Sequence, residues 1–120
     1  MATILLADDD ATVRDLVKRA LTSDGHSVLV TQDGLEAQDV FNAKGRAIDV
    51  LVSDVDMPGL DGISLALHVR SGNPSIPIVL MSGFSDQLEK ASALSQQRVV
   101  SISKPFTLDQ IKQAVRKLLA

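Results

Sequence analysis

The chain has 120 residues, a formal net charge of −3 and no cysteine. These values exclude a disulfide framework and a thiolate metal site, and the mild acidity argues against a nucleic-acid-binding surface, which would carry a basic patch. No apolar run approaches the roughly 20 residues that a membrane span requires. The first residues turn acidic at once and carry no basic segment, so we do not expect them to form a signal peptide. We expect one cytoplasmic domain over residues 1–120, with an aliphatic core because Tyr and Trp are missing.

Five short apolar runs recur along the chain. They are rich in Ile, Val and Leu and mostly continuous, which is typical of strands that are covered on both faces. The first, third and fourth runs are the most apolar and should lie in the centre of a sheet. The predicted strands span residues 3–7, 27–31, 48–53, 76–81 and 99–103.

Helical patterns fill the segments between these runs. The first pattern places five apolar residues on one helix face, with Asp10 as its N-cap: Val13, Leu16, Val17, Ala20 and Leu21. Thr107 and Gln110 predict a capping box at the start of the last helix. Shorter patterns cover residues 35–43 and 63–69. Residues 85–97, rich in Ser and Gln, predict the least firmly held helix.

Five strand–helix repeats predict a parallel sheet with helices on both faces. Because the crossovers of such units are right-handed, few topologies remain. We predict an α/β fold of the flavodoxin-like, doubly wound (βα)5 type with the strand order 2-1-3-4-5.

Polar side chains follow four of the predicted strands. In an open parallel sheet, ligands bind beyond the carboxyl ends of the strands, so these residues should gather there. The first strand is followed by Asp8, Asp9 and Asp10, and the third by Asp54. The fourth strand is followed by Ser82, and the fifth by Lys104 and Pro105.

The charges of this predicted cluster suggest a chemistry. Clustered carboxylates repel one another, so a bare cluster of Asp8, Asp9 and Asp54 would be unfavourable, and a divalent cation would relieve the repulsion. Oxygen ligands without His or Cys favour a hard ion such as Mg²⁺. Such a site can accept a phosphoryl group, for which Mg²⁺, the Lys104 amine and the Ser82 hydroxyl would stabilise the charge. Asp54 is the natural nucleophile, since a carboxylate can form an aspartyl-phosphate.

This constellation resembles the receiver domain of bacterial two-component response regulators. The matching segments are ILLADDD, DVLVSDVDMPGLDG, IPIVLMSG and SKPF, which occur in that order and span nearly the whole chain. The resemblance implies that Asp54 is the phosphoacceptor and that Asp8 and Asp9 hold Mg²⁺. It also implies that Asp56 lends its backbone carbonyl to the metal.

Two further residues take their expected roles from the same resemblance. Ser82 matches the switch hydroxyl that turns toward the phosphoryl group, and Lys104 matches the lysine that pairs with it, with a cis bond to the following proline. The family often has Tyr or Phe three residues before this lysine, whereas this chain has Ser101. Phe84 and Phe106 are the alternative aromatic residues, and Phe106 is better explained as a core residue.

Several other polar residues have ordinary structural explanations. Asp10 is expected to cap a helix rather than bind metal, and Asp61 with Gly62 should start the helix after the third strand. His26 and His68 are expected at the surface or its boundary. Arg70, Lys44 and Arg46 are expected to be solvated charges.

The resemblance implies a phosphorylation switch that modifies only itself and is not an enzyme in the turnover sense. The donor would be a histidine kinase or a histidine phosphotransferase, and the output would pass to a protein partner, without nucleic acid or membrane. The chain would be a monomer or a weak dimer. Met1 just before the first strand fits a native start, and the alternative is a receiver fragment of a larger regulator or hybrid kinase.

The output and two other classes of function stay open. The SGF of residues 82–84 and the SKPF of residues 103–106 are similar to the CpdR group of single-domain receivers, which implies control of ClpXP proteolysis; a chemotaxis-type output is the alternative. The D-x-D of Asp54 and Asp56 also opens haloacid-dehalogenase phosphatases, but there the acidic pair comes last. A phosphorylation-independent binding module would not need the acid–hydroxyl–lysine set.

Overall fold

The computed structural model describes residues 1–83 and 98–120 and contains one five-stranded sheet. All strand pairs are parallel, in the order β2-β1-β3-β4-β5. This arrangement confirms the predicted flavodoxin-like topology. The strands are β1 (Thr3–Ala7), β2 (Ser27–Thr31), β3 (Val50–Asp54), β4 (Ile78–Ser82) and β5 (Val99–Ser103).

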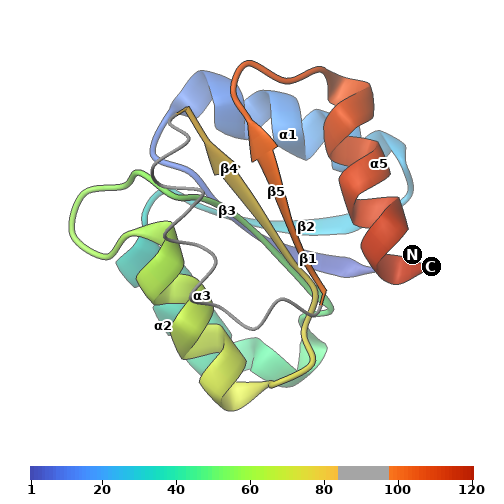
Figure 1. Cartoon of the computed structure of the whole chain (residues 1–120). Helices are drawn as coiled ribbons and strands as arrows, with labels where there is room; N and C mark the ends of the chain where they lie inside the picture. Colours follow the sequence, from blue (N-terminus) through green and yellow to red (C-terminus); the bar gives the residue numbers. More distant parts are fainter. Residues whose placement is uncertain (84–97) are drawn as a thin grey trace.

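Helices cover both faces of the sheet (Figure 1). On one side lie α1 (Ala11–Ser23) and α5 (Leu108–Leu119), and on the other lie α2 (Gly34–Lys44) and α3 (Gly62–Gly72), with the short 3-10 helix η1 (Gly45–Ala47) after α2. The predicted helix at 85–97 and the aromatic residue Phe84 lie outside the described residues. Within the described part of the chain, every helix is too short or too polar to cross a bilayer.

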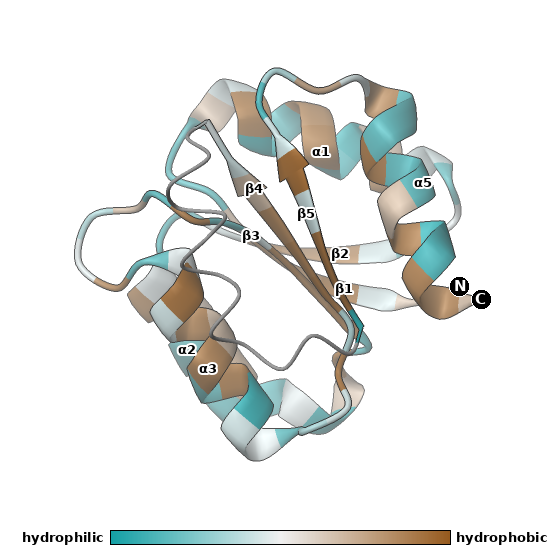
Figure 2. Ribbon diagram, viewed as in Figure 1, coloured by the Kyte–Doolittle hydropathy of each residue, from teal (hydrophilic) through white to brown (hydrophobic). Residues whose placement is uncertain are grey.

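The core is split into two aliphatic layers by the sheet. Alternate residues of β1 point to opposite faces, so Leu5 packs with α2 and α3, whereas Ile4 and Leu6 pack with α1 and α5. Every residue of β3 and β4 is buried, while β2 and β5 are partly exposed. The central position of the most apolar strands is thereby confirmed, and Figure 2 shows hydrophobic colour along much of β3 and β4.

Two strands differ from their predicted ranges at both ends, and each ends one residue later than predicted, at Asp54 and Ser82. β3 and β4 begin two residues later than the apolar runs, because Ile48 and Ile76 lie in turns whose amides donate to Gly45 and Asn73. Both isoleucines are nonetheless buried. Their apolar character therefore reflects the core under the turns rather than the sheet ladder.

The helix caps agree with the sequence. The Asp10 carboxylate accepts the amides of Thr12 and Val13, and Thr107 with Gln110 forms the complete capping box. The prediction that Leu16 faces the core is wrong, since its side chain is 44% exposed. The buried stripe of α1 is centred on Val17, Ala20 and Leu21, and Leu16 lies on its flank.

A glycine joins the end of β3 to the start of α3. The Asp61 carboxylate caps α3 by accepting the amide of Ser64, as expected. A Cβ atom on Gly62 would lie 2.0 Å from the backbone oxygen of Asp54. Only glycine therefore allows α3 to begin this close to the strand end that presents Asp54.

Candidate functional site

Sheet register brings the predicted site residues to one edge. Asp54 is the last residue of β3 and lies beside Met81 of β4, and Ser82 ends β4 beside Ser103 of β5. The amide of Lys104 donates to the backbone oxygen of Ser82 at 2.8 Å, which continues the β4–β5 pairing by one residue. The carboxyl ends of three neighbouring strands thus deliver Asp54, Ser82 and Lys104 together.

The charged groups are close and shielded. The Lys104 Nζ lies 3.2 Å from the Asp54 Oδ1 and 3.9 Å from the Asp8 Oδ2. Asp8 has no exposed surface and Asp54 is 4% exposed, whereas Lys104 is partly open to solvent. One amine therefore faces two buried carboxylates, and the cluster keeps an excess of negative charge.

Burial makes both carboxylates costly to ionise. Loss of hydration raises the pKa of the Asp8 carboxyl to about 6, against the lowering effect of the Asp10 amide and of Lys104. Burial also raises the pKa of Asp54, while the charge and hydrogen bond of Lys104 act in the opposite direction. A single lysine leaves the repulsion and desolvation of this cluster incompletely compensated.

The donor set fits a hard divalent cation. Carboxylate oxygens of Asp8, Asp9 and Asp54 lie within 4.8 Å of one another. The Asp8 Oδ2 is buried without a hydrogen-bond partner, although buried carboxylate oxygens are normally satisfied. Oxygen-only ligands of this kind suit Mg²⁺. An ion here would compensate the orphaned oxygen as well as the excess charge.

Asp56 and Asp10 lie beside this cluster without joining it. The backbone amide of Asp56 hydrogen-bonds the Asp54 carboxylate and lowers its pKa, and the Asp56 side chain is exposed. That its carbonyl binds metal stays a prediction. Asp10 is a helix cap, as expected, and its amide also donates to the Asp8 Oδ1 at 2.9 Å.

Other residues around the fold mostly match their expected places. The Lys104–Pro105 bond is cis. Phe106 is half-buried against the α1–α5 side of the core, while Ser101 is exposed on β5. The switch role of Ser82, which is fully buried, stays a prediction.

The two histidines lie at the boundary of the core, as expected. His26 accepts the amide of Ala2 through Nδ1, and the His68 ring contacts the Asn42 amide oxygen at 2.7 Å. The prediction that Arg70 is merely solvated is wrong. Its side chain is half-buried, and its Nε donates to the backbone oxygen of Ile76 at 3.0 Å in the turn before β4.

Sequence reasoning missed one residue at the site. The Nη1 of Arg14 donates to the backbone oxygen of Asp8 at 2.9 Å, reaching back from the first turn of α1. The available signal was its spacing, since an arginine one turn after the Asp10 N-cap can reach the end of the preceding strand.

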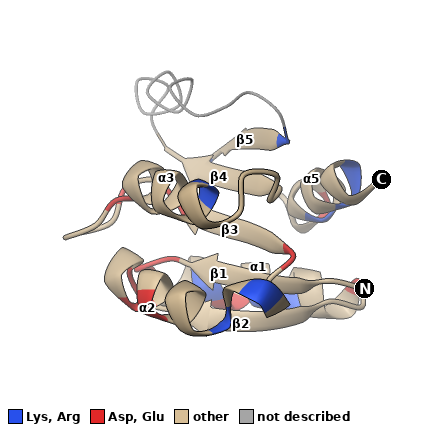
Figure 3. Cartoon of the chain, turned by 90° about the horizontal axis from the view of Figure 1, so that it is seen from below, with Lys and Arg blue, Asp and Glu red and all other residues tan. Residues whose placement is uncertain are grey.

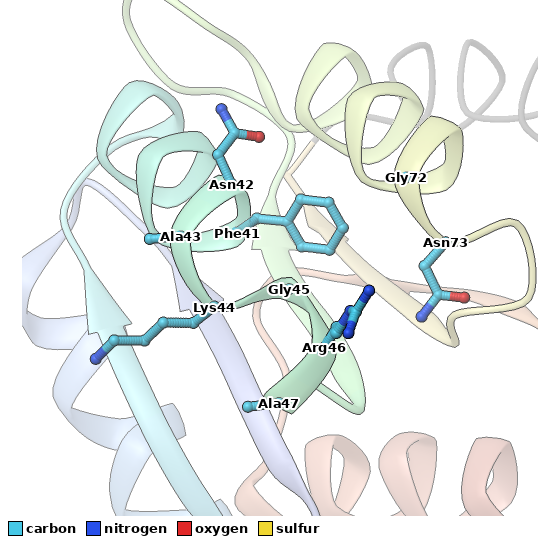
Figure 4. A pocket seen from close by; sticks show the side chains of 9 residues that line it. All are labelled: Phe41, Asn42, Ala43, Lys44, Gly45, Arg46, Ala47, Gly72 and Asn73. Atoms are coloured by element: carbon cyan, nitrogen blue, oxygen red, sulfur yellow. The ribbon is translucent and has the colours of Figure 1, made fainter.

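A surface hollow among the described residues lies away from this cluster. It has a volume of about 720 Å³, sits between the ends of α2 and α3, and includes none of the predicted site residues. Figure 4 shows the ring of Phe41 reaching from α2 toward Gly72. Since a Cβ on Gly72 would lie 2.9 Å from this ring, the hollow borders a tight helix–helix contact.

Basic residues are scattered in the view from below. Figure 3 shows Lys and Arg on α3, at the start of β5 and on α5 as separate patches, with acidic residues on α2.

Comparison with known proteins assigns the family. The model of the response regulator receiver domain matches residues 4–116. The chain is 36% identical over 116 residues to the response regulator MprA of Mycobacterium sp. (strain KMS), covering 97% of this chain and 50% of MprA. It is 33% identical over 118 residues to the sensor kinase CckA of Brucella abortus (strain 2308), covering 98% of this chain and 12% of CckA. The chain thus spans half or less of the length of these relatives.

Solved structures agree with this assignment. A receiver protein from Sinorhizobium medicae WSM419 is 33% identical, with a TM-score of 0.89 and coverage of 98% of this chain and 94% of that one. The response regulator TrrA from Thermotoga maritima, solved with Mg²⁺ and BeF, is 28% identical with a TM-score of 0.86, covering 98% and 99% of the two chains. Receiver domains carry signals in two-component systems rather than acting as classical enzymes. The chain belongs to the response regulator receiver domain family.

Proposed function

We propose that this chain is a cytoplasmic phosphoacceptor in which Asp54 takes a phosphoryl group from a histidine kinase or a histidine phosphotransferase. The observation that carries the proposal is the 3.2 Å contact between Lys104 and the buried Asp54, beside the orphaned oxygen of Asp8. Such a buried acid–amine pair at the end of a central strand has little value for stability by itself. It has a clear value for holding a charged phosphoryl group.

The transfer needs positioning and charge compensation. The Asp54 carboxylate attacks the phosphorus, the bond from phosphorus to the donor imidazole nitrogen breaks, and the nitrogen keeps the electron pair. Lys104 and the Ser82 hydroxyl would donate to the phosphoryl oxygens. Asp8, Asp9 and the Asp56 carbonyl would hold Mg²⁺, which supplies positive charge to those oxygens when bound.

The product is the modified chain itself. Water attacks the phosphorus, the bond from phosphorus to the Asp54 oxygen breaks, and inorganic phosphate leaves, which restores the Asp54 carboxylate. The chain would thus catalyse only its own phosphorylation and dephosphorylation. The same cluster would serve both steps, because both pass through a similar distribution of oxygen charge.

A protein partner is the proposed output, with the chain acting alone or as a weak dimer. Because Ser101 replaces the usual aromatic residue, the coupling from Ser82 to the β5–α5 side must use another route. The SKPF segment at residues 103–106 supports a CpdR-type output, in which the unphosphorylated form assists ClpXP proteolysis. Degradation of a ClpXP substrate that slows when the chain is phosphorylated would support that output. A receiver unit within a longer regulator or hybrid kinase, or a chemotaxis-type output, would show no such effect.

Intact-mass measurement tests the core of the proposal. The chain is incubated with acetyl phosphate and Mg²⁺, in parallel with Asp54→Asn and with a matched control, Asp61→Asn, which keeps a good helix cap. We expect one added phosphoryl group on the wild type and the control, and none on Asp54→Asn or in EDTA. An unmodified wild type with both acetyl phosphate and a histidine phosphotransferase would contradict the proposal. Sustained turnover of a phosphate ester would instead favour a phosphatase.

A further inference from the structure

Arg14 makes a contact that the proposed transfer does not use. It lies in the first turn of α1, half-buried, and its Nη1 donates to the backbone oxygen of Asp8 at 2.9 Å. The ion pairs found within residues 1–83 and 98–120 do not include Arg14. The guanidinium charge is therefore directed at a carbonyl, in a charge-assisted hydrogen bond that is roughly twice as strong as a neutral one.

This carbonyl belongs to the peptide that joins the two proposed metal ligands. The Asp8 amide donates to Thr31 at a long 3.3 Å, which is the last sheet bond before the chain leaves β1. The Asp8 carboxylate is oriented by the Asp10 amide on Oδ1, which leaves Oδ2 free to face Lys104. Without Arg14, the Asp8–Asp9 peptide would be held mainly through its flanking residues.

We propose that Arg14 is a positioning residue for the divalent cation: its guanidinium fixes the Asp8–Asp9 peptide so that both carboxylates reach the ion together with Asp54. The inference rests on the proposed function, because it assumes that this cluster holds Mg²⁺. Some residues do not touch the metal but hydrogen-bond to its ligands and orient them. Mutation of such a residue typically lowers metal affinity 10–100-fold.

Charge alone would predict the opposite effect. A cation near a cation site repels the ion, so removal of Arg14 should strengthen Mg²⁺ binding if only its charge mattered. If the fixed peptide matters more, removal should weaken binding. A role limited to the stability of α1 would leave the affinity unchanged. The sign of the change in Mg²⁺ affinity therefore distinguishes the three explanations.

Calorimetric titration with Mg²⁺ tests the inference on the intact chain. We expect Arg14→Ala to raise the Kd for Mg²⁺ about tenfold, and Arg14→Lys, which keeps the charge and one donor, to restore part of the loss. The matched control is Arg19→Ala, because Arg19 is an exposed arginine further along the same helix. It should keep the wild-type Kd. If Arg14→Ala does not fold, Arg14→Lys and Arg14→Gln carry the comparison.

The outcomes separate this inference from the proposed function. If Arg14→Ala binds Mg²⁺ as tightly as the wild-type chain or more tightly, and the wild-type chain still gains a phosphoryl group, the inference alone is overturned. A wild type that neither binds Mg²⁺ nor gains a phosphoryl group overturns the proposed function as well. A larger Kd in Arg14→Ala, together with a smaller Mg²⁺-induced rise of its thermal midpoint than in the wild type, supports positioning, since a purely structural role would lower the midpoint equally in EDTA and in Mg²⁺.

Discussion

Two of the central strands, β1 and β3, combine a buried apolar middle with a buried carboxylate at the carboxyl end, and burial has opposite effects on the stability of the two parts. In β3, Val50, Leu51 and Val52 are fully buried among aliphatic side chains, and their burial stabilises the sheet. Two residues later Asp54 is almost as buried, but there the loss of hydration raises its pKa and disfavours its charged form. Burial thus stabilises the middle of the strand and destabilises its carboxyl end. Substitutions in the two regions should therefore change stability in opposite directions.

The largest effect is expected in the middle of β3. Leu51→Ala should lower the free energy of unfolding by about 3 kcal/mol, since it removes a buried side chain and leaves a cavity between the sheet and the α2–α3 layer. Urea denaturation followed by circular dichroism measures the change, because the chain has no Trp for fluorescence. Leu67→Ala is the control, since Leu67 is 48% exposed, and should change stability by less than about 1 kcal/mol. Equal losses in both variants would argue against this account of the core.

The junction between the two regions should give the second largest effect. Gly62→Ala places a Cβ atom 2.0 Å from the Asp54 oxygen, so α3 or the end of β3 must shift. We expect a loss of about 2 kcal/mol in unfolding free energy. The shift should also slow the labelling of Asp54 by acetyl phosphate. Gly83→Ala is the matched control, because a Cβ there meets no atom of residues 1–83 or 98–120 within 4 Å. A Gly62→Ala variant with normal stability would show that the strand end tolerates displacement.

The sequence predicts the two regions unequally well. Alternation of apolar runs with helical patterns predicted the parallel sheet, and right-handed crossovers narrowed the possible strand orders. The capping residues Asp10 and Thr107 predicted the starts of α1 and α5. The predicted starts of β3 and β4 were two residues too early, at Ile48 and Ile76. A buried turn and a strand carry the same apolar side chains, so the sequence does not distinguish them. The gathering of Asp8, Asp54 and Lys104 followed from topology alone. The role of Arg14 did not, because a hydrogen bond to one particular carbonyl depends on a side-chain path that periodicity does not record.

Asp8 is the clearest case in which burial of a side chain should lower the free energy of unfolding at neutral pH. Its pKa rises from 3.8 to about 6 on folding, so the folded state binds the proton more tightly than the unfolded state. In EDTA, the wild type should therefore lose stability as the pH rises from about 4 through 6, by roughly 2 kcal/mol at neutral pH. Asp8→Asn has no such charge and keeps an oxygen for the Asp10 amide. The variant should match the wild type near pH 4 and exceed it at pH 7.5.

Mg²⁺ should reduce or reverse the stability difference between the wild type and Asp8→Asn. Added at pH 7.5, it should raise the unfolding free energy of the wild type and have little effect on Asp8→Asn, because the variant has lost one of the proposed ligands. Asp61→Asn, an exposed carboxylate outside the cluster, should respond to pH and Mg²⁺ as the wild type does. If Asp8→Asn is less stable than the wild type at pH 7.5 in EDTA, the carboxylate stabilises the fold. The idea that the buried carboxylate at the end of β1 lowers stability and is present to bind an ion would then be wrong.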